Sequence, residues 1–359
     1  MSIAVHVRRR LLAGLPFAAM LLVAAGDVLA GPDVGLLALF ALGPAFASVS
    51  GSARRAVLVG VFAFALCSAA SAYDGLFLTR RAAVALATVA GATVAASLAA
   101  RLRRGVEREL AGVRSVAEAA QRVLLRPVPR LAGHMRVAVS YTSAVAEARI
   151  GGDLYEVVNG PQVTRAIVGD VQGKGLEAVE TAALVLGAFR EAAPDSPTLQ
   201  HVGARLERAL NRRLEGEEFV TAVLAEVDRR HTVTLLNYGH PPPLLMRADG
   251  TVQLAEPPEP APPLGLAALG PNGPSPHQVQ LRPGDQMLLY TDGVTEARNR
   301  RGEFYPLTQR AFRLKEHDPE AALEALRQDV VEHCAGPLGD DAAMLLLRYR
   351  DEPGAEAEM

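Results

Sequence analysis

Four short acidic motifs stand where predicted strands meet glycines. They are Gly-Gly-Asp at 151–153, Gly-Asp-Val-Gln-Gly-Lys-Gly at 169–175, Thr-Asp-Gly at 291–293 and Gly-Asp-Asp at 339–341. Because glycine lets the backbone approach closely, each motif places a short carboxylate at the rim of a sheet. Converging carboxylates repel one another unless a cation lies among them. The motifs therefore predict a cation site built from Asp153, Asp170, Asp292, Asp340 and Asp341.

The residue types indicate which cation and which reaction. Oxygen ligands from Asp, backbone carbonyls and water suit Mg²⁺ or Mn²⁺. The sequence offers no His/Cys cluster for zinc, and Cys67 and Cys334 lie in regions of very different composition, so no disulfide framework is expected. Two divalent cations about 3.5–4 Å apart can bring an activated water and a phosphoryl oxygen together. The implied reaction is in-line hydrolysis of a phosphomonoester. A nucleotide phosphate loop is excluded, because it needs Ser or Thr where Gly175 stands.

The elements that must position these carboxylates follow from the hydrophobic periodicity. After residue 131 the pattern alternates, and it predicts strands at 135–141, 153–158, 163–170, 220–227, 232–238, 244–247, 251–254, 277–281, 286–291 and 342–349. Helical patterns cover 176–192, 199–214 and 320–333, with a weaker one at 307–314, and the Pro-rich stretch 257–276 reads as a surface loop. Helices occur in pairs between blocks of strands, which favours a layered α+β fold over a doubly wound one.

Taken in order, the segments resemble the SpoIIE-type bacterial branch of the PPM (protein phosphatase 2C-like) serine/threonine phosphatases. The matching stretches are 149–155 (RIGGDLY), 169–178 (GDVQGKGLEA), 219–227 (FVTAVLAEV), 237–245 (NYGHPPPLL), 263–266 (PLGL), 281–298 (LRPGDQMLLYTDGVTEAR) and 339–347 (GDDAAMLLL). They cover about residues 135–350. Their order and spacing are far more specific than any single motif.

The resemblance implies a β-sandwich of two facing antiparallel sheets, flanked by helices, with a di-metal site for Mn²⁺ or Mg²⁺ at one end. The implied ligands are Asp153, Asp170, the carbonyl of Val171, Asp292 and Asp340, with Asp341 as a replacement or support for Asp340. The implied substrates are phosphoserine or phosphothreonine on anti-anti-sigma factors, whose dephosphorylation frees a sigma factor by partner switching. The helix at 176–192 is either a movable element that couples dimerisation to metal binding or a static core helix.

The sequence departs from the family pattern at a few positions. Ala343 stands where Thr or Ser is common, so a supporting hydrogen bond is expected to be missing, and Glu177 replaces a small residue or Pro. No histidine closely follows Asp170, so no general acid is identified. His240 is expected to be structural rather than catalytic. Lys174 either positions phosphate or has a structural role.

Residues 1–100 form a region of different character. They hold seven Arg and three acidic residues, and the uncharged runs 11–26, 34–53, 56–73 and 82–100 have the length of membrane-spanning helices. We therefore predict four transmembrane helices. With the N-terminus inside, nine arginines flank the inner ends and Arg80 and Arg81 flank the outer ends, which favours a multi-pass protein of the bacterial inner membrane with its C-terminal domain in the cytoplasm.

Two other interpretations of this region carry less weight. Residues 8–30 also fit a signal peptide, but three further spans favour an uncleaved anchor. The runs contain no charged residue, which argues against a transporter. The loops on the outer side are short, which argues against a large extracellular sensor.

Residues 101–130 are predicted to form a linker helix that ends before Pro127 and Pro129. Apolar residues repeat at 106, 110, 113, 117, 120 and 124, which is the seam of a short coiled coil. The helix either pairs two chains through 101–125 or packs on its own domain. The predicted domains are thus 1–100 (membrane), 101–130 (linker), 131–350 (phosphatase) and 351–359 (a disordered acidic tail).

The leading hypothesis is a membrane-anchored, metal-dependent phosphoprotein phosphatase. A second is a catalytically silent relay that binds a phosphorylated partner, and a third is a membrane sensor of a small molecule or lipid, which is compatible with the first. Nucleic-acid binding is not expected, because residues 101–359 carry a net charge of −6 rather than a basic face.

Overall fold

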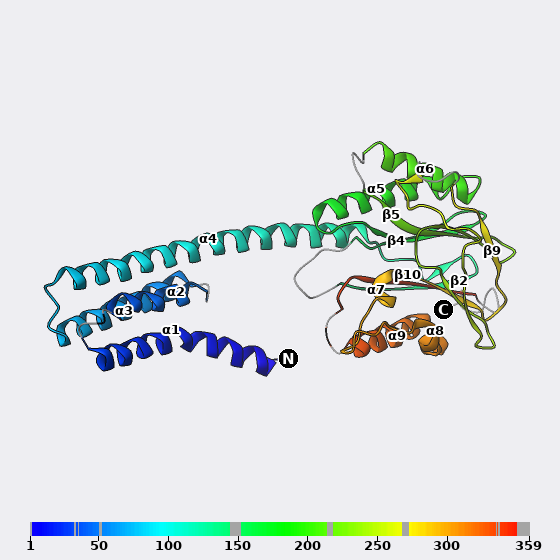
Figure 1. Ribbon diagram of the computed structural model, residues 1–359. Helices are drawn as coiled ribbons and strands as arrows, with labels where there is room; N and C mark the ends of the chain where they lie inside the picture. The colour runs from blue at the N-terminus through cyan, green and yellow to red at the C-terminus, as the bar shows by residue number, and fades with distance from the viewer. Residues whose placement is uncertain are drawn as a thin grey trace, which may run out of the picture. The chain divides into compact units, whose positions relative to one another are not determined.

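The computed structural model describes residues 2–31, 34, 36–49, 52–143, 152–213, 218–267, 273–334, 336 and 338–349. The chain divides into two compact units, Met1–Gly112 and Val113–Met359 (Figure 1). We call them the helical unit and the sheet unit. The division falls inside the predicted linker, and the predicted tail 351–359 lies outside the described residues.

The helical unit contains α1 (Ser2–Ala30), the 3₁₀ helix η1 (Leu36–Ala41), α2 (Leu42–Val49), α3 (Ala53–Tyr73) and the first part of α4 (Arg80–Leu124). Small residues let these helices approach closely. At Gly60 a Cβ atom would lie 2.2 Å from the Thr93 side chain, so α3 and α4 are in direct contact there.

Among the described residues, two helical segments are long and apolar enough to cross a membrane, Ala53–Tyr73 and Arg80–Glu109. They correspond to the third and fourth predicted spans. The apolar segments Gly14–Leu29 and Leu36–Ser48 are shorter than that criterion. Within the described ranges, two of the four predicted spans therefore meet the criterion, and the four-span arrangement stays a prediction.

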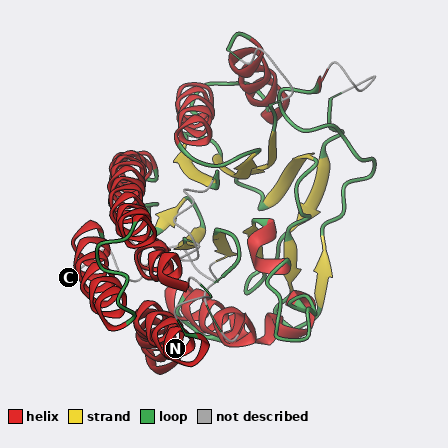
Figure 2. Ribbon diagram, turned by 60° about the vertical axis from the view of Figure 1, so that its left-hand side comes forward, coloured by secondary structure: helices red, strands yellow, loops and turns green. Residues whose placement is uncertain are grey.

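The sheet unit contains two antiparallel sheets. The first has the order β1 (Leu131–Ala132), β2 (Met135–Thr142), β11 (Ala342–Tyr349), β10 (Gln286–Tyr290), β7 (Leu244–Met246) and β8 (Val252–Leu254). The second has the order β3 (Leu154–Asn159), β4 (Thr164–Val171), β5 (Val220–Val227), β6 (Thr232–Tyr238) and β9 (His277–Gln280). Figure 2 shows these strands between layers of helices.

Three apolar layers hold the sheet unit together. Along β4, Ala166 and Val168 face the other sheet, while Ile167 faces α5 (Leu176–Ala192) and α6 (Leu199–Asn211). The outer face of the first sheet packs against α9 (Pro319–Cys334) and the short helices α7 (Asp292–Thr295), α8 (Leu307–Arg310) and η3 (Ala311–Lys315). Because both faces of the central strands are buried, these strands are almost continuously apolar.

The elements agree closely with the predicted pattern. The predicted α+β sandwich is confirmed, as is the helix at 176–192, and α4 runs without a break from the fourth predicted span through the linker to Leu124. One prediction needs correction, and two elements were missed. The helix predicted to reach residue 214 ends at Asn211, whereas β1 and α7 were not predicted because elements of two and four residues have no measurable periodicity.

Candidate functional site

The register of the strands brings the acidic motifs to one end of the sandwich. In one sheet Leu154 pairs with Gly169, so Asp153 and Asp170 lie on adjacent strand ends. In the other sheet Tyr290 pairs with Met344, so the Thr-Asp-Gly turn lies beside the Asp-Asp pair. A hydrogen bond joins the two sheets here, from the Thr291 hydroxyl to Asp153 Oδ2 at 2.7 Å.

Two glycines allow these segments to meet. A Cβ atom at Gly152 would lie 2.5 Å from the carbonyl oxygen of Val171. A Cβ atom at Gly293 would lie 1.7 Å from the carbonyl oxygen of Asp341. The backbone contact that defines the site therefore tolerates no side chain at either position.

Burial and mutual repulsion raise the carboxyl pKa values. Burial, followed by the charge of Asp170, raises the pKa of Asp153 well above its ordinary value. Burial, followed by the charge of Asp292, raises the pKa of Asp170 to about 7. Burial is again the main cause for Asp292, with contributions from the charges of Glu296 and Asp340. These groups resist ionisation together, which is the electrostatic condition that a bound cation relieves.

This donor set fits a hard divalent cation. It consists of carboxylate oxygens and a backbone carbonyl, with no sulfur or imidazole ligand among them. Within the described part of the chain, no three His, Cys, Asp or Glu side chains already surround a common ion position. The fit therefore rests on the convergence of the carboxylates and on their raised pKa values.

The two aspartates before β11 have different surroundings. Asp341 is buried, and its carboxylate accepts hydrogen bonds from the Tyr141 hydroxyl and from Ser143 Oγ at 3.4 Å. The Asp340 side chain is 50% exposed and forms an ion pair with Lys174, with 2.8 Å between Nζ and Oδ1. The Asp341 backbone N–H also donates to Asp340 Oδ1 at 2.9 Å.

Thr291 is a functional candidate that sequence reasoning missed. Its side chain is fully buried and bridges the sheets through Asp153, and the backbone N–H of Ala343 donates to its hydroxyl oxygen at 2.9 Å. This backbone bond does not depend on the side chain at position 343, so the loss of a side-chain hydrogen bond at Ala343 stays a prediction. The sequence signal that could have identified Thr291 is its position directly before Asp292 in the Thr-Asp-Gly motif.

His240 is buried, and both of its ring nitrogens lie within hydrogen-bonding distance of a partner. Its ring lies between Tyr290 O, 3.0 Å from Nε2, and Thr221 Oγ1, 3.0 Å from Nδ1. Burial lowers its pKa to about 4, so the neutral ring donates from Nε2 to the Tyr290 carbonyl. This contact fixes the backbone that leads into Thr291 and Asp292.

The end of the linker helix reaches the same region of the sheet unit. Ala120 and Leu124 pack against Val179 of α5. Gln121 Nε2 donates to the Tyr141 hydroxyl at 2.7 Å, and that hydroxyl donates to Asp341. At these two positions of the predicted seam, the interpretation as a helix packed on its own domain is therefore correct.

Comparison with known proteins gives a consistent picture. Residues 160–350 match the family model described as stage II sporulation protein E (SpoIIE). A solved structure of RsbU and RsbW domains from Mycobacterium tuberculosis is 25% identical, with a TM-score of 0.52, and covers 64% of this chain and 64% of that one.

Two further solved structures show the fold. The PP2C phosphatase domain of SpoIIE from Bacillus subtilis, with a fragment of its regulatory domain, is 21% identical over 59% of this chain and 63% of that one, with a TM-score of 0.52. The SiaA-PP2C domain of Pseudomonas aeruginosa is 20% identical over 68% of this chain and 98% of that one, with a TM-score of 0.56. The chain thus spans 64% and 63% of the first two solved chains.

Proposed function

The chain belongs to the SpoIIE family, and from this premise we propose that it is a metal-dependent protein serine/threonine phosphatase. The observation that carries the proposal is the convergence of Asp153, Asp170, Asp292 and Asp340 at one end of the PP2C-type sandwich, with pKa values raised by burial and by one another for the first three. Such a cluster calls for cations, and the reaction typical of this fold uses them.

We assign a role to each group at the site. Asp153, Asp170, the Val171 carbonyl, Asp292 and Asp340 would hold two divalent cations, Mn²⁺ or Mg²⁺. When bound, the cations supply water activation and charge neutralisation for the phosphoryl group. Asp341 acts as a support for Asp340 rather than as a direct ligand, because its oxygens accept from Tyr141 and Ser143.

Three side chains position the carboxylates of the site. Thr291 orients Asp153 by a hydrogen bond across the two sheets. Tyr141 fixes the carboxylate of Asp341. Lys174 neutralises Asp340, and its exposed position also allows it to meet a substrate phosphate. The site thus combines carboxylates that range from buried (Asp153) to half-exposed (Asp340) with the cationic side chain of Lys174 at its rim.

We further propose that the protein is a multi-pass protein of the bacterial inner membrane whose phosphatase domain, residues 131–350, lies in the cytoplasm. The two long apolar helices support this location. The proposed substrate is a phosphoserine or phosphothreonine regulator of the anti-anti-sigma type. The similarity to a structure that contains RsbU and RsbW domains supports that choice.

A homodimer through residues 101–125 would use the N-terminal part of the predicted seam. Val106 is 56% exposed, whereas Ala120 and Leu124 pack on α5. Equal monomeric masses for the full chain and a Val106→Glu variant in sedimentation would exclude this dimer. The alternative of a catalytically silent relay rests on Ala343, which has no side-chain hydroxyl to form the supporting hydrogen bond.

The test is phosphate release by the full chain in lipid from a phosphoserine protein, with Mn²⁺, Mg²⁺ or chelator. We expect metal-dependent release that falls by about 10³-fold or more in Asp170→Asn. Asp195→Asn, an exposed aspartate in the turn after α5, is the matched control and should retain full activity. Binding of the phosphoprotein without release in any metal would support the relay instead.

A further inference from the structure

A pocket of about 610 Å³ lies between the first turn of α3 and the segment of α4 around residues 101–108. We call it the arginine pocket. Its walls include four arginines and two apolar side chains, which are Arg54, Arg101, Arg104, Arg108, Val57 and Leu58. No described residue of the acidic motifs of the sheet unit lines this pocket.

The charge of this pocket is uncompensated within the part of the chain that the structure describes. Arg101, Arg104 and Arg108 share one face of α4, because they are spaced three and four residues apart. None of the four pocket arginines pairs with a described carboxylate; Glu107 pairs instead with Arg103, at 3.9 Å. Four guanidinium groups around one cavity repel one another and favour an anion, above all a phosphate that accepts bidentate hydrogen bonds.

The other wall of the pocket is apolar. Val57 is 42% exposed and Leu58 is 70% exposed, and both project from a helix apolar enough to span a membrane. The pocket lies where the apolar stretch of α4 passes into the charged linker. A ligand that satisfies both walls carries a phosphate at one end and hydrocarbon at the other.

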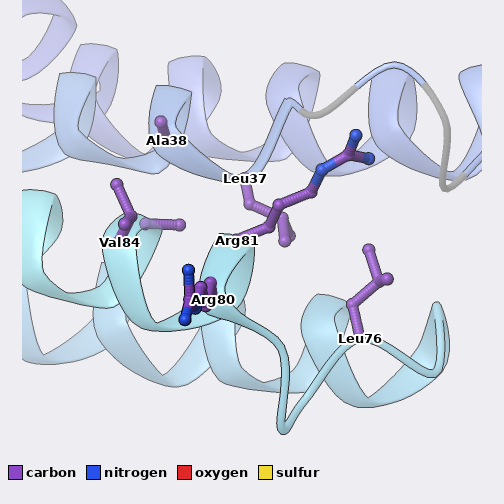
Figure 3. A pocket seen from close by; sticks show the side chains of 7 residues that line it. Leu37, Ala38, Leu76, Arg80, Arg81 and Val84 are labelled. Carbon is purple, nitrogen blue, oxygen red and sulfur yellow. The ribbon is translucent and has the colours of Figure 1, made fainter.

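A second pocket in the helical unit serves as a comparison for the arginine pocket. It has about 410 Å³ and is lined by Arg80 and Arg81 at the start of α4, with Leu37 from η1 and Leu76 from the loop after α3 (Figure 3). This pocket offers two arginines where the arginine pocket offers four. Variants of the two pockets can therefore distinguish nonspecific attraction of anionic lipids to any arginine from specific recognition by the four-arginine cluster.

We propose that the arginine pocket binds an anionic phospholipid of the surrounding membrane, with its phosphate on the arginines and its acyl chains along Val57 and Leu58. The inference rests on the membrane location proposed above and is independent of the phosphatase activity. Basic pockets on the cytoplasmic side of membrane helices recognise lipid headgroups in this way.

The experiment measures calorimetric binding of dioctanoylphosphatidylglycerol to the full chain in a neutral detergent. Dioctanoylphosphatidylcholine and sodium phosphate, at equal ionic strength, are the comparison ligands. Each arginine near an anionic lipid contributes about fivefold to affinity. The triple variant Arg101→Gln, Arg104→Gln, Arg108→Gln should therefore bind phosphatidylglycerol on the order of 100-fold more weakly. The double variant Arg80→Gln, Arg81→Gln should bind like wild type.

Several results would overturn the lipid proposal. Equal binding of both lipids would exclude anion recognition, and equal binding of free phosphate would identify a simple anion site. Equal loss in the Arg80/Arg81 variant would indicate nonspecific attraction. The corresponding triple Arg→Lys variant should stay within about tenfold of wild type and shows that loss is not misfolding. Recovery of the chain in the soluble fraction after carbonate extraction would remove the membrane premise, whereas absent phosphate release with intact lipid binding would overturn the phosphatase proposal alone.

Discussion

The aspartate site of the sheet unit and the arginine pocket of the helical unit are both clusters of like charge, but they are built differently. The aspartates come from four distant segments and are held by backbone contacts and buried hydrogen bonds. The arginines come from two helices, and three of the four are largely exposed. A buried cluster needs its counterion at a fixed place, whereas an exposed cluster is partly neutralised by water and salt. We therefore expect the aspartate site to be rigid and sensitive to substitution. We expect the arginine pocket to tolerate substitutions at neighbouring positions.

The largest expected difference concerns glycine replacement. Gly293→Ala would force a Cβ atom against the Asp341 carbonyl, so we expect a loss of more than about 4 kcal/mol in unfolding free energy or no folded protein. Gly105→Ala lies on α4 between Arg104 and Arg108 with no atom within 4 Å, so we expect a gain of about 0.5–1 kcal/mol. Thermal and denaturant unfolding of both variants measures this. Comparable stability of the two variants would contradict the contrast in rigidity.

The next effect concerns the bond between the sheets. Thr291→Val keeps the shape of the side chain but removes the hydroxyl that donates to Asp153 and accepts from Ala343. We expect metal affinity and phosphatase activity to fall about 10–100-fold. Thr291→Ser restores the hydroxyl and should recover most of both. If Val and Ser variants behave alike, Thr291 is only a packing residue.

These residues also show how far sequence reasoning reaches. The Asp motifs and the helix at 176–192 were predictable, because glycines mark strand ends and apolar spacing marks helix faces. Tyr141 and Asp341 are 200 residues apart in the sequence, so no local sequence pattern predicts their contact. The hydrogen bond from the Ala343 backbone N–H to Thr291 was hidden for a different reason, because a main-chain donor has no signature in a sequence.

Salt dependence distinguishes the two clusters directly. Raising NaCl from about 0.05 to about 0.5 M screens exposed charges strongly and buried charges weakly. We expect the affinity for phosphatidylglycerol to fall at least tenfold and the affinity for Mn²⁺ to change less than about threefold. Calorimetric titrations of the full chain at both salt concentrations measure this. Equal sensitivity would mean that the two sites are equally solvated.

The pH dependence of stability tests the aspartate site alone. The pKa of Asp170 in the folded chain is about 7, above its ordinary value of 3.8, so protonation favours the folded state. In chelator, this stabilisation is present below about pH 4 and is lost as the pH rises through 7. We expect the Tm in chelator to be lower at pH 8 than at pH 6, and Mn²⁺ to raise it more at pH 8. The Asp170→Asn variant should show a smaller difference, since Asp153 and Asp292 also have raised pKa values. A wild-type Tm that is flat across this range would refute the assigned shift.

The smallest effect is expected at Tyr141, where the linker helix meets the site. Tyr141→Phe leaves the ring in place and removes the hydroxyl between Gln121 and Asp341. Because Asp341 is proposed to support Asp340 and not to bind metal itself, we expect only about a threefold to tenfold loss of Mn²⁺ affinity. Tyr349→Phe, at the opposite end of β11, removes a hydroxyl bonded to His231 and should leave metal affinity unchanged. A loss of 100-fold or more at Tyr141 would instead make Asp341 a direct ligand. If Tyr141→Phe has no larger effect than Tyr349→Phe, the contact of the linker helix with Tyr141 has no influence on metal binding at the site.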